Sequence, residues 1–266
     1  MVFSIKVSKF DLDKSLSCGQ CFRWFKKPDY WTGVVNKFPV SAHLKNETLT
    51  IESDLNDLDF WLNYFDLNFD YECACTVLSN CGETISKAIN ENFGIHILNQ
   101  DPWETLCSFI ISQNNNIPRI TNIISRLCNL FGDKPYGVSS FPRPEIISYL
   151  NIHDLSHIKA GFRAKYILDA AKCIVSSRIS LDIVKSMKTN DAIKYLQTIY
   201  GVGPKVASCT LLYGYHKLDC FPIDTWMRKV LSKFFQNFDY QSFKGYQGLA
   251  QLYLFNWSRS HPEYFQ

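Results

Sequence analysis

The chain has 266 residues, of which 46% are hydrophobic and 20% are charged, and its formal net charge is +3. This composition is typical of a folded globular protein and excludes a disordered chain or a strongly basic one. Any nucleic-acid surface must therefore be a local patch. The sequence shows no secretory signal and no run near the roughly 18 apolar residues that a membrane span needs. We expect a protein without membrane contact, located in a bacterial or archaeal cytoplasm, or in the nucleus if the source is eukaryotic.

The ten cysteines have the distribution of free thiols. Several lie in apolar stretches, which predicts buried, reduced side chains in a chain without an export signal: Cys107, Cys128, Cys173 and Cys209. The segment Cys18-Gly19-Gln20-Cys21 has the spacing of half a zinc site, but the later pair Cys73-Ala74-Cys75 has the wrong spacing for the other half. No cysteine follows Cys220, which excludes a four-cysteine iron–sulfur loop at the C-terminus. We therefore expect no metal.

The first part of the chain is β-rich. Short strand-like runs separated by turn residues are found at Cys21–Phe25, Trp31–Val35, Pro39–Leu44 and Thr48–Ile51. They predict an antiparallel sheet with one buried face, and helical spacing begins near Asp57. We expect an N-terminal sheet domain with flanking helices over residues 1–95.

The remainder has helical periodicity. Asp101, Pro102 and Glu104 have the pattern of a helix start, and the apolar spacing of Ile117–Phe131 predicts an amphipathic helix that ends at Gly132. Further helical stretches are expected near 144–150, 163–176, 189–199, 204–215, 225–236 and 242–257. The predicted fold is α+β, with a helical domain over residues 96–266.

The pattern predicts a helix-hairpin-helix motif over residues 189–215. Gly201-Val202-Gly203 would join two helices, and Pro204 suits the first position of the second helix. The amides at that helix start, together with its dipole, can bind a DNA phosphate that the glycines allow to approach closely. A plain turn between two helices is the alternative.

Lys205 and Asp224 are the candidate catalytic residues. Lys205 lies on the first turn of an apolar helix, where partial desolvation favours the neutral, nucleophilic amine. Asp224 precedes another helix, and it either only caps that helix or also stabilises positive charge that develops on a sugar.

With the hairpin, these two residues resemble the helix-hairpin-helix DNA glycosylase superfamily. Within it, the chain is most similar to the 8-oxoguanine DNA glycosylases of the eukaryotic type, over nearly its whole length. The resemblance implies that Lys205 is the nucleophile and Asp224 its acidic partner. It also implies a bifunctional glycosylase and lyase that flips out 8-oxoguanine, preferably opposite cytosine, forms a Schiff base and cleaves by β-elimination.

The resemblance assigns a second group of residues to the DNA. Asn114, the first asparagine of Gln113–Arg119, would fill the gap left by the flipped base, and Arg119 would read the orphan cytosine. In Gly161–Tyr166, Phe162 would wedge the duplex and Arg163 would also read cytosine. Family members usually carry a tyrosine where this chain has Phe162.

A third group forms the expected base pocket. The carbonyl of Gly19 would accept the N7 hydrogen of 8-oxoguanine, and Cys209 would lie against the base. On a C-terminal helix near 242–257, Gln251 would read the Watson–Crick edge and Phe255 would stack on the base. Trp226 replaces a histidine that lies near a phosphate in animal members, so it either stacks or packs.

The expected partner is double-stranded DNA that contains an oxidised purine, bound by a monomer without a cofactor. Two alternatives stay open: a glycosylase of this superfamily for other purine lesions, and a non-catalytic DNA-binding module. The pairing of Lys205 with Asp224 argues against the module, because phosphate contacts do not require a partly desolvated amine.

Overall fold

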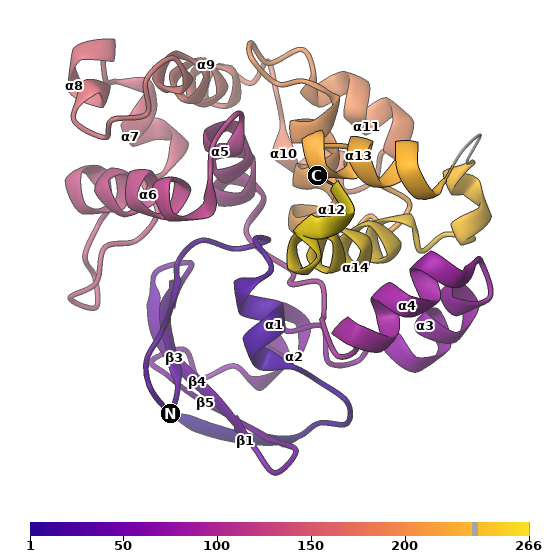
Figure 1. Cartoon of the computed structure of the whole chain (residues 1–266). Helices are drawn as coiled ribbons and strands as arrows, with labels where there is room; N and C mark the ends of the chain where they lie inside the picture. Colours follow the sequence, from indigo (N-terminus) through magenta and orange to yellow (C-terminus); the bar gives the residue numbers. More distant parts are fainter. Residues whose placement is uncertain (236–238, 266) are drawn as a thin grey trace.

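The computed structural model describes residues 1–235 and 239–265. Its N-terminal part contains a five-stranded antiparallel sheet of order β1-β5-β4-β3-β2 (Figure 1). The strands are β1 (Val2–Lys6), β2 (Trp24–Lys26), β3 (Trp31–Val35), β4 (Phe38–Lys45) and β5 (Thr48–Ser53). The β4–β5 hairpin turns through Asn46 and Glu47, both with positive φ, which is the geometry that matches the twist of two paired strands. The expected antiparallel sheet is confirmed.

Two differences from the expected strands have clear causes. β1 was not predicted, because this short strand alternates only between exposed and half-buried positions. The strand expected from Cys21 begins only at Trp24, because the preceding segment is pinned by side-chain hydrogen bonds. Gln20 donates to the carbonyls of Ser15 and His96, both at 2.8 Å, and accepts from the amide of Leu98 at 2.9 Å.

Four helices accompany the sheet: α1 (Leu12–Ser17), α2 (Leu58–Tyr64), α3 (Tyr71–Ser79) and α4 (Glu83–Asn92). The first two pack on the sheet and share its apolar core. The other two lie beside the C-terminal helix (Figure 1), where Cys75 contacts the hydroxyl of Tyr253 at 3.6 Å and Asn92 accepts from Asn256 at 2.5 Å. The core that contains α3 and α4 is therefore shared with the helical body.

The helical body follows the predicted order. Its helices are α5 (Pro102–Ser112), α6 (Ile117–Phe131), α7 (Pro144–Ser148), α8 (Ile152–Ser156), α9 (Arg163–Val175), α10 (Leu181–Val184), α11 (Thr189–Leu196), α12 (Pro204–Tyr215), α13 (Thr225–Phe234) and α14 (Gln247–Ser260). Residue 236, at the end of one expected helix, lies outside the described residues. Short 3-10 turns cover Tyr240–Phe243 and Pro262–Phe265. The α+β fold is confirmed.

The closely packed pair α5 and α12 forms the centre of the body. Every residue of α5 from Thr105 to Ile111 is buried, as expected for a helix that is apolar on most of its surface. A Cβ at Gly214 would lie 3.1 Å from Pro102 Cα, so glycine is what lets the two helices approach at this end. The same packing brings the end of α5 beside the start of α12. In the described part of the chain, no helix has the length and apolar character needed to cross a membrane.

Candidate active site

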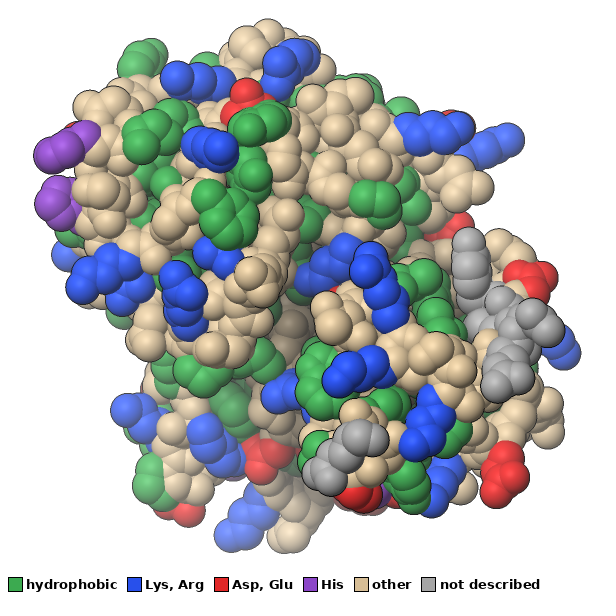
Figure 2. All heavy atoms as spheres, turned by 45° about the horizontal axis from the view of Figure 1, so that its top comes forward, with side chains coloured by type: hydrophobic (Ala, Val, Ile, Leu, Met, Phe, Trp, Pro, Cys, Tyr) green, Lys and Arg blue, Asp and Glu red, His purple; other side chains and the backbone are tan. Residues whose placement is uncertain are grey.

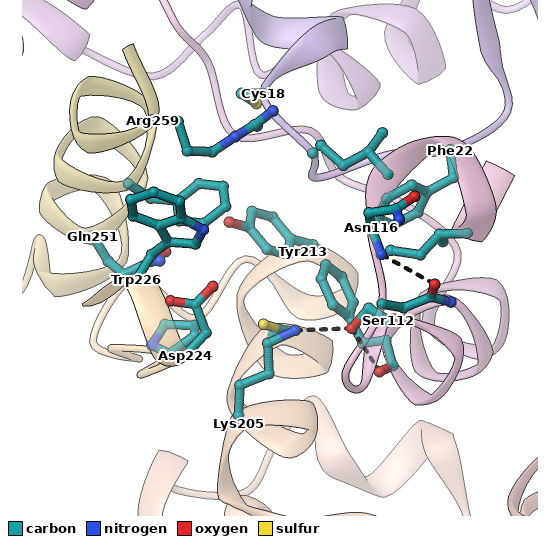
Figure 3. Close-up of a pocket in the computed structure, with 18 of the residues that line it drawn as sticks. Cys18, Phe22, Ser112, Asn116, Lys205, Tyr213, Asp224, Trp226, Gln251 and Arg259 are labelled. Carbon is teal, nitrogen blue, oxygen red and sulfur yellow. Dashed lines mark hydrogen bonds between the residues drawn. The ribbon is translucent and has the colours of Figure 1, made fainter. Parts of the chain in front are cut away.

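A cavity of about 310 Å³ opens where the N-terminal segment meets α5, α12, α13 and α14 (Figure 3). Its walls come from segments far apart in the sequence. Cys18, Gly19 and Phe22 contribute one wall, Lys205 and Asp224 lie on another, and α14 closes a third. The structure therefore brings the predicted catalytic pair and the predicted base-pocket residues into one enclosure.

Lys205 lies on the first turn of α12 and is half-buried. Its Nζ donates to Ser112 Oγ at 2.9 Å and lies 4.8 Å from the centroid of the Phe109 ring. The Ser112 hydroxyl itself donates to the carbonyl of Phe109 at 2.8 Å. The amine is thus held at the cavity wall by a hydroxyl oxygen at the end of α5 and by an aromatic face.

Asp224 is the N-cap of α13. Its Oδ1 accepts from the amide of Met227 at 2.8 Å, while the described residues provide no hydrogen bond to Oδ2. Figure 3 shows the Asp224 carboxylate and the Lys205 amine projecting into the same cavity. Capping and a role in the cavity are therefore compatible, because each uses a different carboxylate oxygen.

Cys209 lies one helical turn after Lys205 and is 4% exposed. Burial raises the pKa of its thiol to about 11, against a smaller opposite effect of the neighbouring Lys205 charge. At neutral pH the thiol is protonated, so Cys209 presents an uncharged, polarizable surface to the cavity.

The α14 wall carries Gln251 and Phe255 at helical spacing. Gln251 is buried, and its Oε1 has no hydrogen-bond partner among the described residues. An amide oxygen left unpaired in a protein interior costs about 1–3 kcal/mol, which a ligand that donates a hydrogen bond to it would recover. The half-buried Phe255 offers a ring face nearby.

Gly19 occupies a backbone conformation that favours glycine, with φ of +93°. A Cβ there would lie 3.0 Å from Ile117 Cδ1. The hydrogen bonds of Gln20 hold this turn against the start of the helical body. The cavity therefore has a rigid, side-chain-free wall at Gly19.

The predicted DNA-facing residues of the Gln113–Arg119 and Gly161–Tyr166 motifs lie in the loops before α6 and α9 and on the first turns of these helices. Asn114 has a left-handed φ of +47° and is exposed, as is Arg119 on the first turn of α6. Phe162 is 47% exposed at the start of α9, which suits an apolar wedge. All three side chains are therefore open to a ligand outside the cavity.

Arg163 differs from the expectation. It is 3% exposed, and its guanidinium donates to the carbonyls of Gln113, Asn114 and Ala160. Burial, followed by the nearby charge of Arg119, lowers its pKa. A side chain predicted at a base edge instead fastens the Asn114 loop to α9, because the left-handed turn directs several backbone carbonyls toward it.

The hairpin glycines have different surroundings. At Gly201, with φ of +82°, a Cβ would lie 2.2 Å from Cγ of Tyr166. At Gly203 a Cβ would meet nothing within 4 Å. The amide of Tyr200 donates to the Asp169 carboxylate at 3.0 Å, which ties the hairpin to α9. Gly201 is thus required by internal packing, whereas Gly203 leaves open space at the start of α12.

Several cavity residues were not predicted from the sequence: Ser112, Tyr213 and Arg259. Ser112 directly precedes the Gln113–Arg119 motif, and Arg259 follows Phe255 by one helical turn. Both residues are therefore next to motif residues from which the site was predicted. Trp226 borders the cavity, and its ring packs edge-on against Phe265 at 5.8 Å. In the described residues no group of three His, Cys, Asp or Glu side chains could hold a metal ion.

Comparison with protein families divides the chain into two matched parts. Residues 2–106 match the N-terminal domain of 8-oxoguanine DNA glycosylase, and residues 107–243 match the HhH-GPD superfamily of base excision DNA repair proteins. The chain belongs to the HhH-GPD superfamily. Because its N-terminal domain is that of the 8-oxoguanine DNA glycosylases, the resemblance drawn from the sequence is confirmed.

The names of relatives of this HhH-GPD chain agree with the family assignment. It is 30% identical to a probable N-glycosylase/DNA lyase of Methanothermobacter thermautotrophicus over 229 residues, which cover 73% of this chain and 72% of the relative. It is 36% identical to the N-glycosylase/DNA lyase of Saccharomyces cerevisiae over 159 residues, which cover 54% of this chain. The latter match spans 42% of the yeast protein, less than half of its length.

Solved structures extend the likeness to the whole HhH-GPD chain. MBOgg1, in complex with a low-affinity DNA ligand, has a TM-score of 0.92 at 36% identity, covering 98% of this chain and 96% of that one. The Clostridium acetobutylicum 8-oxoguanine glycosylase/lyase, bound to double-stranded DNA with cytosine opposite 8-oxoguanine, has a TM-score of 0.88 at 31% identity, covering 98% of both chains.

Proposed function

We propose that this chain is a DNA glycosylase with lyase activity that removes 8-oxoguanine from duplex DNA, preferably opposite cytosine. The observation that carries the proposal is the convergence of Lys205 and Asp224 on one cavity from two neighbouring helix starts. A deoxyribose between them has a nucleophile on one side and a carboxylate on the other. The named activity of the relatives supports the same reaction.

The damaged nucleotide must leave the base stack to reach these groups, because a stacked base shields its sugar carbon. The surface around the cavity suits a duplex. Figure 2 shows Lys and Arg side chains spread around a hollow, with few acidic side chains among them. We propose that the hairpin at Gly201 and Gly203 binds a phosphate through the amides at the start of α12, and that Phe162 and Asn114 enter the space left by the flipped nucleotide.

The reaction proceeds in three steps. The neutral amine of Lys205 attacks C1′ as the bond to N9 of the base breaks, and the electron pair of that bond leaves with the base. Asp224 stabilises the positive charge that develops on the sugar. Loss of a proton from nitrogen and opening of the sugar ring give a Schiff base, and removal of a C2′ proton then expels the 3′ phosphate by β-elimination.

The base pocket follows from the remaining walls. We propose that the base lies between Cys209 and the ring of Phe255, while Gln251 pairs with its Watson–Crick edge through the otherwise unpartnered Oε1. Gly19 would receive the N7 hydrogen through its carbonyl. All of these groups come from one chain, so the proposed working form is a monomer.

Borohydride trapping tests the proposal. Wild type incubated with an 8-oxoguanine–cytosine duplex and borohydride should give a covalent complex, because reduction captures the Schiff base. Lys205→Gln should give none while its affinity for the duplex stays within about twofold, since phosphate contacts remain. Lys172→Gln, an exposed lysine on α9, is the matched control and should trap like wild type.

Trapping of Lys205→Gln at wild-type yield would contradict the assignment. A panel of duplexes with 8-oxoguanine, 8-oxoadenine, 3-methyladenine and undamaged guanine separates the proposed substrate from other purine lesions. Faster excision of a lesion other than 8-oxoguanine would favour a glycosylase for that lesion.

A further inference from the structure

Arg259 places a cationic side chain at the cavity that the reaction described above does not use. It lies on the last turns of α14, one helical turn after Phe255 and two after Gln251, so the three side chains share one face. Its guanidinium carbon lies 5.5 Å from the centroid of the Phe255 ring. In Figure 3 the Arg259 side chain reaches from α14 across the cavity toward Cys18.

In the described part of the chain, the Arg259 guanidinium has no protein acceptor. Among the described residues, none forms a hydrogen bond or an ion pair with Arg259, although the side chain lines the cavity. Its Nη1 lies 3.9 Å from the position that a Cβ of Gly19 would take, so its donors reach the glycine wall. The Arg259 side chain is exposed. Because a guanidinium can only donate hydrogen bonds, a ligand in the cavity that offers an acceptor at this wall can replace the solvent around it.

The geometry of α14 indicates where that acceptor lies. The backbones of Gln251 and Arg259 are about 12 Å apart along the helix, and helical side chains lean toward the N-terminus, which brings the guanidinium back over Phe255. A purine that stacks on Phe255 and presents its Watson–Crick edge to Gln251 therefore presents its opposite edge to Arg259. On that edge guanine has a C8–H, whereas 8-oxoguanine has a carbonyl oxygen.

We propose that Arg259 donates a hydrogen bond to the C8 carbonyl oxygen of 8-oxoguanine and so determines specificity for the lesion. The inference rests on the function proposed above and adds a residue to it. A charged donor gives this contact about twice the strength of a neutral hydrogen bond. The contact exists only for a base that is oxidised at C8.

The contact also acts on the chemistry. When the C1′–N9 bond breaks, the electron pair received by N9 spreads over C8 to its carbonyl oxygen, which becomes more negative. A guanidinium at that oxygen stabilises the leaving base more in the transition state than in the ground state, which lowers the barrier. Loss of Arg259 should therefore reduce the single-turnover rate and not only the affinity.

The test combines a change in the residue with a change in the atom. Single-turnover excision is measured opposite cytosine for 8-oxoguanine and for 8-thioguanine, which keeps the N7 hydrogen but replaces the oxygen by a weaker acceptor. Arg259→Met should slow excision of 8-oxoguanine by about tenfold or more and that of 8-thioguanine by less than about threefold. Arg259→Lys keeps a cationic donor. It should therefore excise 8-oxoguanine faster than Arg259→Met does, whereas the two variants should excise 8-thioguanine at similar rates.

Controls separate the possible failures. Arg143→Met removes an exposed arginine outside the cavity and should change neither rate. Circular dichroism and melting temperature check that Arg259→Met folds, and affinity for a duplex with an abasic-site analogue should stay within about twofold. Equal loss on the two lesions, or a parallel loss of affinity for the abasic duplex, would show a phosphate contact and overturn the inference. If wild type does not excise 8-oxoguanine, the proposed function itself fails.

Discussion

The hydroxyl of Ser112 serves Lys205 only as a hydrogen-bond acceptor. Its single hydrogen is donated to the carbonyl of Phe109 at 2.8 Å, so the oxygen facing Nζ at 2.9 Å offers a lone pair. A neutral amine that donates one hydrogen to this oxygen has its lone pair directed elsewhere. In the proposed mechanism, Ser112 is therefore a positioning residue that orients the amine of Lys205.

We expect Ser112→Ala to slow single-turnover excision by about tenfold, because a nucleophile that loses its orientation loses part of the proximity effect. The variant should still give the covalent complex with borohydride, since Lys205 is intact. Ser112→Thr keeps the acceptor and is the matched control, with a rate near that of wild type. A rate for Ser112→Ala equal to wild type would remove Ser112 from the mechanism.

Asp224→Asn separates the two roles of Asp224. Asparagine can still accept from the amide of Met227, so the melting temperature should change little. Excision should fall by about 10²–10³, because a charge aimed at the developing cation is lost. The measurements are single-turnover kinetics and thermal unfolding followed by circular dichroism. A variant that unfolds, or that keeps its rate, would leave Asp224 as a helix cap alone.

Arg119 and Arg163 should behave differently when the opposite base is varied. Arg119 is exposed, as is the proposed wedge residue Phe162. Arg119→Ala should reduce the preference for cytosine by about tenfold, which is roughly the discrimination that one contact to a base edge provides. Arg163 is buried against carbonyls of the Asn114 loop, so Arg163→Ala should slow excision opposite all four bases by similar factors and lower the melting temperature. If Arg163→Ala specifically removes the cytosine preference, Arg163 reads the base after a rearrangement of this loop.

The two hairpin glycines form a matched pair. Gly201→Ala forces a Cβ into the ring of Tyr166 at a positive φ and should destabilise the fold by about 1–3 kcal/mol. For a chain of this size that corresponds to a melting temperature lower by roughly 2–12 °C. Gly203→Ala meets open space and should leave stability unchanged while weakening duplex binding, because the methyl group occupies the approach of a phosphate. Thermal unfolding and fluorescence anisotropy distinguish the two; unchanged binding by Gly203→Ala would place the phosphate elsewhere.

The sequence could predict the elements that carry a local pattern. Alternating burial along β5 and the Asp101-Pro102 helix start are examples, and both lie where they were expected. β1 escaped prediction because this short edge strand alternates only between exposed and half-buried positions, with none fully buried. The pairing of α3 and α4 with α14 could not be predicted either, since it joins segments more than 150 residues apart.

Prediction of the site was limited in the same way, because contacts between segments far apart in the sequence leave no local pattern. The motif positions of Lys205, Gln251 and Phe255 lead to one cavity because each motif is local. The burial of Arg163 depends instead on a loop 50 residues away, which the family resemblance that assigned Arg163 to the orphan cytosine could not reveal. Arg259 could have been found, because its spacing from Phe255 matches that of Phe255 from Gln251.

The turn at Gly19 contributes a wall to the cavity, yet it belongs to a different stretch of chain from every group that makes or breaks a bond. Gln20 fastens that turn to the backbone at His96 and Leu98, and the Gln20 carbonyl accepts from the Gln100 side chain at 2.9 Å. Substitutions in this short turn can therefore alter which lesion fits while Lys205 and Asp224 keep their geometry. In evolutionary terms, the proposed choice of lesion and the proposed strand cleavage rest on different parts of this chain and can diverge separately.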